Sequence, residues 1–398
     1  MLAKDNLRNI VSVFSGCGGF DIGFRSAGFV PIAAFDQDRV AVENYRDNIG
    51  PRAIVADLTK ELPFSSQESV GVMLAGPPCQ GFSTAGNRDP NDRRNDLLPL
   101  NAQLALRLKP QVVVVENVSG VQSGEHARHW TELEYRLRLA GYRTHSILVD
   151  GLMVGMAQRR RRWFLFAWRT RCEVNLSWPT ARADRLDRVL SGVECQTSHN
   201  PKPLQEGSRL HKIARRIGPG QKLCNVRGGL RSVHTWHIPE VFGRTTAAEC
   251  ALLEAVMRIR RAERRRDRGD ADPVTPKRLK REFGNRVEAL IHSLLIKGYL
   301  RQLGRYVDLV HTFNGKFRRV RWEDVSCTVD TRFGDPHLFL HPNEHRPFTV
   351  REAARIQGFP DAYNFRGSER DHFRLIGNAV PPQMAAGAAM IARRLLGI

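Results

Sequence analysis

The chain has no apolar run long enough to span a lipid bilayer, although it is 398 residues long. Its first residues, MLAKDNLRNIVSVF, also lack an apolar stretch that is followed by a small-residue cleavage site. These two absences argue against membrane insertion and against secretion. We therefore expect a cytoplasmic protein with no membrane partner.

Cysteine is scarce, and the spacing of its few residues shows no pairing. No two of the seven cysteines stand at the C-x-x-C spacing or at the spacing of zinc ligands. An odd number without such pairs favours a reduced, intracellular chain without a structural metal. We also find no internal repeat and no long low-complexity tract.

Acidic residues are too few to balance the basic ones. The 41 Asp and Glu stand against 62 Lys and Arg, which gives a net charge of +21 at pH 7. Such an excess indicates a polyanionic partner, most simply nucleic acid. Hydrophobic residues make up 41% of the chain, so a sizeable core can form and global disorder is excluded.

The first part of the chain, residues 1–170, alternates short apolar runs with amphipathic stretches. This rhythm predicts βα units, and several runs are apolar throughout, as in strands that are covered on both faces. The predicted fold class is therefore α/β, with a doubly wound, mostly parallel sheet. We expect strands at 10–14, 31–36, 53–57, 70–75, 111–117, 142–149 and 162–168.

The pattern changes over residues 171–345, which predict a second, smaller domain with more Arg, Pro and Gly. Within about 245–322, three helical stretches precede a hairpin whose turn we expect at Asn314-Gly315. That order is the outline of a winged helix, and a coincidental helical insertion is the alternative. Residues 346–398 return to helices, and the closing helix after Pro381-Pro382 is expected to pack on the first domain.

A glycine-rich segment, VFSGCGGFDIGF, follows the first predicted strand and opens a helix. Gly16, Gly18 and Gly19 stand where the backbone must turn sharply and let a ligand approach. The segment matches neither the G-x-G-x-x-G fingerprint nor a P-loop, so we expect a nucleoside without a demanding phosphate. Asp36 and Asp57 end the next two strands. There Asp36 could accept hydrogen bonds from ribose hydroxyls, and Asp57 could accept one from an exocyclic amine. The alternative is an ordinary tight turn.

Two further strand ends carry reactive side chains. Cys79 follows a strand in LAGPPCQGFSTAG, and Glu116 follows another in VVVVENVSG. Ligands of open parallel sheets bind at the carboxyl ends of strands, so a thiol nucleophile and a carboxylic acid are predicted in one crevice. Taken singly, the cysteine could be inert and buried, and the Glu-Asn pair could be a helix cap.

Four consecutive arginines precede the last apolar strand, in AQRRRRWFLFAW. Alternation along the incoming strand would send Arg160 and Arg162 to the same side, toward the crevice. A solvated or phosphate-facing patch is the alternative.

With these motifs in place, the sequence resembles the DNA (cytosine-5) methyltransferase family over nearly all of the chain outside the middle region. Six motifs in the same order carry the resemblance: FSGCGG at 14–19, PPCQGFS at 77–83, ENV at 116–118, QRRRRW at 158–163, REAARIQGFPD at 351–361 and GNAVPP at 377–382. It implies a sheet of the S-adenosylmethionine-dependent methyltransferase type. It also implies a catalytic and cofactor-binding domain at 1–170, a target-recognition domain at 171–345, and a hinge segment with a returning C-terminal helix at 346–398.

The resemblance implies S-adenosyl-L-methionine as cofactor and S-adenosyl-L-homocysteine as product. Phe14 and the Gly16–Gly19 backbone would hold its methionine part, Asp36 its ribose and Asp57 its adenine amine, while Asn378 would close over the site. The full set of expected cofactor-binding residues is Phe14, Ser15, Gly16, Cys17, Gly18, Gly19, Asp36, Gln37, Asp57, Leu58, Pro78, Asn378 and Ala379.

The same resemblance makes Cys79 the nucleophile, Glu116 the acid on the cytosine ring and Arg162 a donor to the ring carbonyl, and we add Arg160 to the catalytic set. The residue types fit the chemistry, because thiolate addition at carbon-6 turns an unreactive carbon-5 into an enamine. Negative charge then develops on the ring, which calls for a carboxyl of raised pKa and a preorganised cation.

The implied partner is double-stranded DNA, from which the target cytosine must be flipped out. A cognate restriction endonuclease, a prokaryotic nucleoid setting and a monomeric enzyme are further expectations. Two alternatives stay open: a tRNA cytosine-5 methyltransferase, and a weak or dead scaffold that acts as a DNA-binding regulator.

Overall fold

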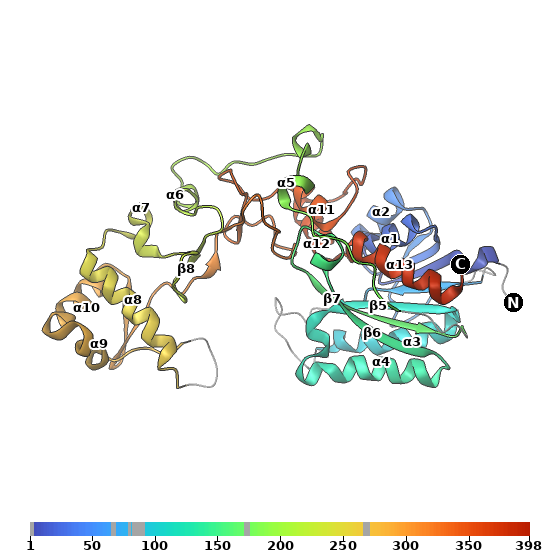
Figure 1. Cartoon of the computed structure of the whole chain (residues 1–398), viewed down its shortest axis with the longest axis horizontal. Coiled ribbons are helices and arrows are strands. Elements are labelled where there is room, and N and C mark those ends of the chain that lie inside the picture. The colour runs from blue at the N-terminus through green and yellow to red at the C-terminus, as the bar shows by residue number, and fades with distance from the viewer. Residues whose placement is uncertain (1–3, 65–68, 79–80, 82–91, 171–175, 266–270) are drawn as a thin grey trace. The chain divides into compact units, whose positions relative to one another are not determined.

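The structure is a computed structural model that describes residues 4–64, 69–78, 81, 92–170, 176–265 and 271–398 (Figure 1). Cys79 lies outside the described residues. The chain forms two compact units: unit 1 comprises Met1–His199, Glu323–Arg332 and Val350–Ile398, and unit 2 comprises Asn200–Trp322 and Phe333–Thr349. The predicted division at 170/171 thus falls within the first segment of unit 1.

Unit 1 is built on a seven-stranded sheet with the strand order β3-β2-β1-β4-β5-β7-β6. Neighbours from β3 to β5 run parallel, whereas β7 runs antiparallel to both β5 and β6. The predicted α/β fold with a mostly parallel sheet is confirmed. The strands are β1 Asn9–Val13, β2 Val30–Asp36, β3 Ala53–Val55, β4 Val72–Ala75, β5 Val112–Val118, β6 Arg143–Asp150 and β7 Arg161–Trp168.

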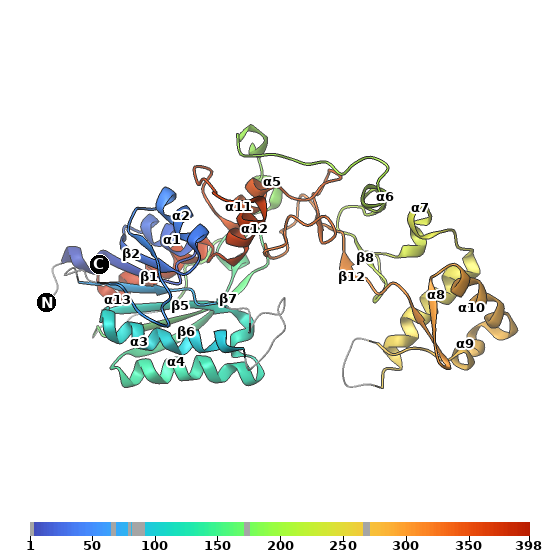
Figure 2. The same cartoon turned by 180° about the vertical axis from the view of Figure 1, so that it is seen from behind.

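Helices cover both faces of this sheet, which explains why its central strands are apolar throughout. α1, α2 and α13 lie on one side, and α3 and α4 on the other (Figures 1 and 2). Every residue of β1, β4 and β5 is buried. The helices of unit 1 are α1 Gly19–Ser26, α2 Arg39–Asn48, α3 Leu97–Leu108, α4 Ala127–Leu139, α5 Leu186–Val189, α11 Val350–Gln357, α12 Glu369–Asn378 and α13 Pro382–Leu396.

The first and last helices of unit 1 pack backbone against backbone. A Cβ atom on Gly23 of α1 would lie 2.4 Å from the Ala385 Cβ and 2.5 Å from the Pro382 carbonyl oxygen of α13. Only glycine permits this approach. The contact brings the C-terminal segment, with Asn378 and Ala379, to the start of the chain, where the glycine-rich turn lies.

Unit 2 contains three small sheets and five helices among its described residues. β12 pairs with β8, which pairs with β9; β10 pairs with β11, and β13 with β14. The elements are α6 Arg209–Arg216, β8 Lys222–Cys224, β9 Ser232–Val233, α7 Pro239–Phe242, α8 Ala247–Ala262, α9 Pro276–Phe283, α10 Val287–Ile296, β10 Leu300–Leu303, β11 Tyr306–Leu309, β12 Asn314–Lys316, β13 Arg318–Arg319 and β14 Phe339–Leu340.

The predicted hairpin turn in this unit is wrong. Leu303 pairs with Tyr306, so the hairpin of β10 and β11 turns at Gly304-Arg305, where Gly304 adopts φ +58°. Asn314 instead pairs with Cys224 of β8, about ninety residues away along the chain. An Asn-Gly pair favours a tight turn locally, but here a long-range strand pairing decides its structure.

No helix in the described part of the chain combines the length and the apolar character that a membrane span requires.

Candidate active site

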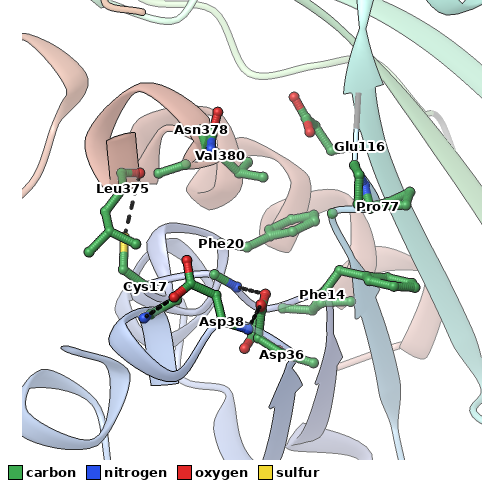
Figure 3. Close-up of a pocket in the computed structure, with 18 of the residues that line it drawn as sticks. Phe14, Cys17, Phe20, Asp36, Asp38, Pro77, Glu116, Leu375, Asn378 and Val380 are labelled. Carbon is green, nitrogen blue, oxygen red and sulfur yellow. Dashed lines mark hydrogen bonds between the residues drawn. The ribbon is translucent and has the colours of Figure 1, made fainter. Parts of the chain in front are cut away.

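A cavity of about 310 Å³ opens in unit 1 at the carboxyl ends of β1, β2, β4 and β5. Phe14 and Asp36 lie on one side of it, and Asn378 and Val380 lie across from them (Figure 3). The structure brings together most of the residues expected from the sequence. The lining includes Phe14, Ser15, Gly16, Cys17, Asp36, Gln37, Pro78, Glu116, Arg162, Asn378 and Ala379.

The glycine-rich turn after β1 forms one wall of the cavity. Phe14 and Gly16 adopt φ values of 53° and 54°, and the Gly18 N–H donates to the Ser15 carbonyl at 3.0 Å. Gly18 and Gly19 do not line the cavity, because they pack inside unit 1. A Cβ atom on Gly18 would lie 1.9 Å from the Ile49 side chain. These two glycines therefore allow the turn to fold tightly, and Gly16 faces the ligand space.

The Asp36 carboxylate is fixed at the end of β2. Its oxygens accept hydrogen bonds from the backbone N–H groups of Gly16, at 2.8 Å, and of Asp38, at 2.9 Å. Burial raises the pKa of Asp36, and these two hydrogen bonds oppose that rise because they favour the charged form. The carboxyl thus stands in a defined orientation at the cavity wall, as a hydrogen-bond acceptor for a polar ligand.

A second buried carboxyl, Asp21 of α1, also lines the cavity and was missed by the sequence analysis. Its Oδ1 accepts hydrogen bonds from the hydroxyls of Ser12 and Tyr45, at 2.5 and 2.8 Å. Burial raises the pKa of Asp21 from 3.8 to about 6. The available signal was an acidic residue inside the apolar stretch GFDIGF, where a helix facing the sheet should carry only apolar side chains.

Glu116 and Arg162 form a buried ion pair at the cavity wall. Arg162 Nε lies 2.8 Å from Glu116 Oε1, and only 13% and 10% of the two side chains are exposed. The pairing of β5 with β7 sets this contact, because Arg162 stands opposite Val118 in the antiparallel register. Burial raises the pKa of Glu116, while the charges of Arg162 and then Arg160 work against the rise. A carboxyl and a guanidinium thus face one cavity with little solvent between them.

Arg160 does not line the cavity. Its guanidinium is buried and donates to the carbonyls of Val329 at 2.9 Å, Gly377 at 3.0 Å and Ala379 at 3.1 Å. Gln357 donates to the Ala379 carbonyl as well, at 3.0 Å. Arg160 therefore holds the segment that carries Asn378 against the sheet, and its contacts are those of a positioning residue.

Two other expected residues lie away from the cavity. Asp57 is partly exposed, and its Oδ1 accepts hydrogen bonds from the Thr59 N–H at 3.1 Å and from the Thr59 hydroxyl at 2.7 Å. Leu58 is buried among core residues. Their roles in cofactor binding, like that of Cys79 in catalysis, stay predictions.

The rim of the cavity is also tied to α12. Arg374 forms ion pairs with Asp38, the N-cap residue of α2, and with Asp371. Arg374 and Asp38 both line the cavity, and the sequence analysis named neither. No local signal marks Arg374, because its partner Asp38 is more than three hundred residues away along the chain.

The chain matches a known family over almost its whole length. The family pattern of C-5 cytosine-specific DNA methylase matches residues 8–391. Type II methyltransferase M.AgeI of Thalassovita gelatinovora is 27% identical over 450 residues, which cover 95% of this chain and 97% of the relative. Type II methyltransferase M.DdeI of Desulfomicrobium norvegicum is 28% identical, with 96% of this chain and 87% of the relative covered.

Solved structures show the same fold. A prophage-encoded Escherichia coli protein, described as a DNA modification methyltransferase, superposes with a TM-score of 0.58 at 20% identity, over 98% of this chain and 99% of the other. The Dnmt2 methyltransferase of S. pombe superposes with a TM-score of 0.52 at 16% identity, over 98% of this chain and 99% of its own.

Proposed function

Since the chain belongs to the C-5 cytosine-specific DNA methylase family, and so is a DNA cytosine-5 methyltransferase, we propose how its own residues perform the reaction. The enzyme transfers a methyl group from S-adenosylmethionine to carbon-5 of a flipped-out cytosine, within a specific sequence of duplex DNA. The reaction passes through a covalent bond between Cys79 and carbon-6 of the ring.

One observation carries this proposal above the others. The buried Glu116–Arg162 pair lines the same cavity as the Gly16–Asp36 wall. A cytosine and a nucleoside-like methyl donor need such neighbouring subsites, one with a proton donor and a cation, the other with a carboxylate for the ribose. Pro78, which directly precedes Cys79, also lines this cavity.

The residues of the cavity fit S-adenosylmethionine. Asp36 presents a fixed carboxylate to the ribose hydroxyls, and Phe14 and Phe20 add apolar surface. Ser15 Oγ and Asp21 Oδ2 are buried and have no hydrogen-bond partner among the described residues. Buried polar atoms of this kind call for a partner, and a polar ligand supplies one. When bound, S-adenosylmethionine supplies a methyl group on a positively charged sulfur.

Cys79 and Glu116 share the activation of the cytosine. The thiolate of Cys79 forms a bond to carbon-6, and the electron pair released from the ring is taken up as Glu116 protonates ring nitrogen-3. Arg162 donates to the ring carbonyl oxygen, where its charge is already in place when the adduct forms. Carbon-5 then accepts the methyl group, a base such as water removes the carbon-5 proton, and the thiolate leaves as the ring double bond re-forms.

The burial of Glu116 supports its role as the acid. Burial raises the pKa of Glu116, which favours its protonated form, and a protonated carboxyl can donate to the ring nitrogen. The nearby Arg162 limits this rise, so the group can also return to the charged form once the product leaves.

The net charge of +21 favours a DNA partner, and unit 2 is a second unit that can contact the duplex. Because such binding depends on many contacts with phosphates, the affinity should fall as the salt concentration rises. The relatives named as type II methyltransferases belong to prokaryotes. We extend this context to the chain: it acts as a monomer on the DNA of a prokaryotic cell, beside a restriction endonuclease that cuts the same sequence.

Transfer of labelled methyl groups to DNA and to tRNA tests the proposal. Wild-type protein should label duplex DNA and not tRNA, and conversion sequencing should place the label at cytosines within one short sequence. Cys79→Ala should abolish transfer, whereas Cys195→Ala, which removes an exposed free cysteine, should leave it unchanged. Preferred labelling of tRNA, or full activity of Cys79→Ala, would contradict the proposal.

A further inference from the structure

Unit 2 contains a small subdomain with a core of its own, to which α8, α9, α10, β10 and β11 contribute buried residues. Figure 1 shows its three helices close together. The hairpin of β10 and β11 follows the three helices directly, and Val274, between α8 and α9, forms a single antiparallel bridge with Val307 of β11. Three helices followed by a hairpin, in this order, have the outline of a winged helix. The order of three helices and a hairpin agrees with the order that the sequence predicted, although the hairpin turns at Gly304-Arg305.

The second and third helices are arranged as a helix-turn-helix. α9 ends at Phe283, Gly284 adopts φ +62°, and α10 begins at Val287, so only three residues connect the two helices. Leu279 of α9 and Val287 and Ile291 of α10 are buried in one core. A short turn that contains glycine is typical of this motif, which places its second helix in the major groove of DNA.

The outer side of α10 carries side chains that can contact base edges. Ala289 and His292 are exposed and three residues apart, so they share one face of α10. Asn285 is exposed in the short turn that leads into the helix. Val287 and Ile291 are buried on the other side. Asparagine and histidine can hydrogen-bond to bases, and the small Ala289 between them lets the helix approach closely.

Basic side chains that have no acidic partner stand next to this face, which also carries Glu288, an exposed glutamate that pairs with Lys280. Lys277, Arg281 and Arg286 are exposed, and none of them forms an ion pair with a described residue. Other basic side chains of the subdomain are neutralised, such as Arg278, which contacts Glu263 and Glu282. The unpaired charges of Lys277 and Arg281 on α9 suit contact with a phosphate backbone, whereas Arg286, at the N-terminus of α10, stands beside the residues that can contact bases.

The tip of the hairpin adds a further cation. Arg305 lies 5.2 Å from the centre of the Tyr306 ring and donates to its hydroxyl at 3.1 Å, which holds the guanidinium at the turn. Gln302 and Gly304 next to it are exposed. A narrow, polar hairpin with an ordered arginine fits the backbone or the minor groove beside the site of α10.

We propose that this winged helix binds duplex DNA, with α10 in the major groove and the hairpin against the neighbouring backbone, and that Asn285, Arg286 and His292 read base pairs. The contacts of these residues with bases would extend the recognition sequence beyond the base pairs at the methylated cytosine. It deepens the proposed function by naming where sequence is read, and it can be tested without catalysis.

Selection of DNA from a random library by the full-length Cys79→Ala protein tests this inference, because binding does not need the nucleophile. Arg286→Ala should lose the preference for one or two base pairs, by about 5- to 150-fold, without a change in thermal stability. Arg286→Lys should keep the affinity and its salt dependence but lose much of the same preference, since lysine cannot make a bidentate contact. His292→Ala should relax a different base pair.

Arg261→Ala is the matched control, because Arg261 is exposed on α8 and its loss changes the charge of the subdomain equally. It should leave the selected sequence unchanged. If Arg286→Ala and His292→Ala select the same sequence as Arg261→Ala with equal affinity, the inference is overturned. Failure of wild-type protein to methylate DNA would instead count against the proposed function, and the selection would still report on the winged helix.

Discussion

Replacing Arg162 by methionine tests the role of the buried ion pair. The substitution keeps the aliphatic part of the side chain and removes the guanidinium that lies 2.8 Å from Glu116 Oε1. Loss of one preorganised donor of this kind typically costs about 2.7–4 kcal/mol of transition-state stabilisation. We therefore expect the single-turnover rate of methyl transfer to fall by about 10²–10³-fold.

The same variant should change the pH dependence of the rate in a defined direction. Arg162 is the largest factor that opposes the rise in the pKa of Glu116, so its removal leaves burial less opposed and raises that pKa further. If protonated Glu116 is the active form, the decline of the rate at high pH should begin at a higher pH in Arg162→Met than in wild type.

Arg161→Met provides the control, since Arg161 is the exposed neighbour on the same strand and carries the same charge. It should retain the wild-type rate and pH profile. An equal loss of rate in both variants would show that only net charge matters. An unchanged high-pH limb in Arg162→Met would refute the assignment of Glu116 as the acid.

Three other outcomes follow from the packing and charges of unit 1. Burial raises the pKa of Asp21 from 3.8 to about 6, so its ionisation costs the folded protein stability as pH rises through this range. Asp21→Asn should therefore be more stable than wild type by up to about 3 kcal/mol near neutral pH, and this difference in stability should vanish below about pH 4. Urea unfolding that gives the same difference at both pH values would contradict this cause. Gly23→Ala should lower the stability by about 1–3 kcal/mol because its Cβ would lie 2.4 Å from a side chain of α13, whereas Gly50→Ala, with nothing within 4 Å, should change the urea midpoint little. Asp36→Ala should weaken the binding of S-adenosylhomocysteine by about 10- to 150-fold in calorimetry, since it removes a charged hydrogen-bond acceptor; unchanged affinity would remove Asp36 from the cofactor site.

Much of unit 1 could be predicted from the sequence because its signals are local. The runs at 10–14 and 111–117 are apolar without interruption, as strands covered on both faces must be, and they became β1 and β5. The carboxyl ends of neighbouring parallel strands meet at one edge, so the placement of Gly16, Asp36 and Glu116 around one cavity followed from the strand order.

The rest depends on contacts between residues far apart in the chain, which no local pattern records. Arg160 and Arg162 look alike in the run QRRRRW, yet Arg162 faces the cavity while Arg160 is buried against the carbonyls of Gly377 and Ala379. Arg374 lines the cavity beside Asp38, with which it forms an ion pair across more than three hundred residues of the chain. These positions are decided by how the last helices return to the sheet.

Trapping on DNA that contains 5-fluorocytosine tests the central claim most directly. Fluorine at carbon-5 cannot leave as a proton does, so an enzyme that attacks carbon-6 through sulfur stays attached to its substrate. We expect wild-type protein, with S-adenosylmethionine, to form a complex that survives denaturant, and mass spectrometry to locate the attached nucleotide on the peptide containing Cys79. A trapped complex in Cys79→Ala, or none in wild type on DNA that it methylates, would contradict the account.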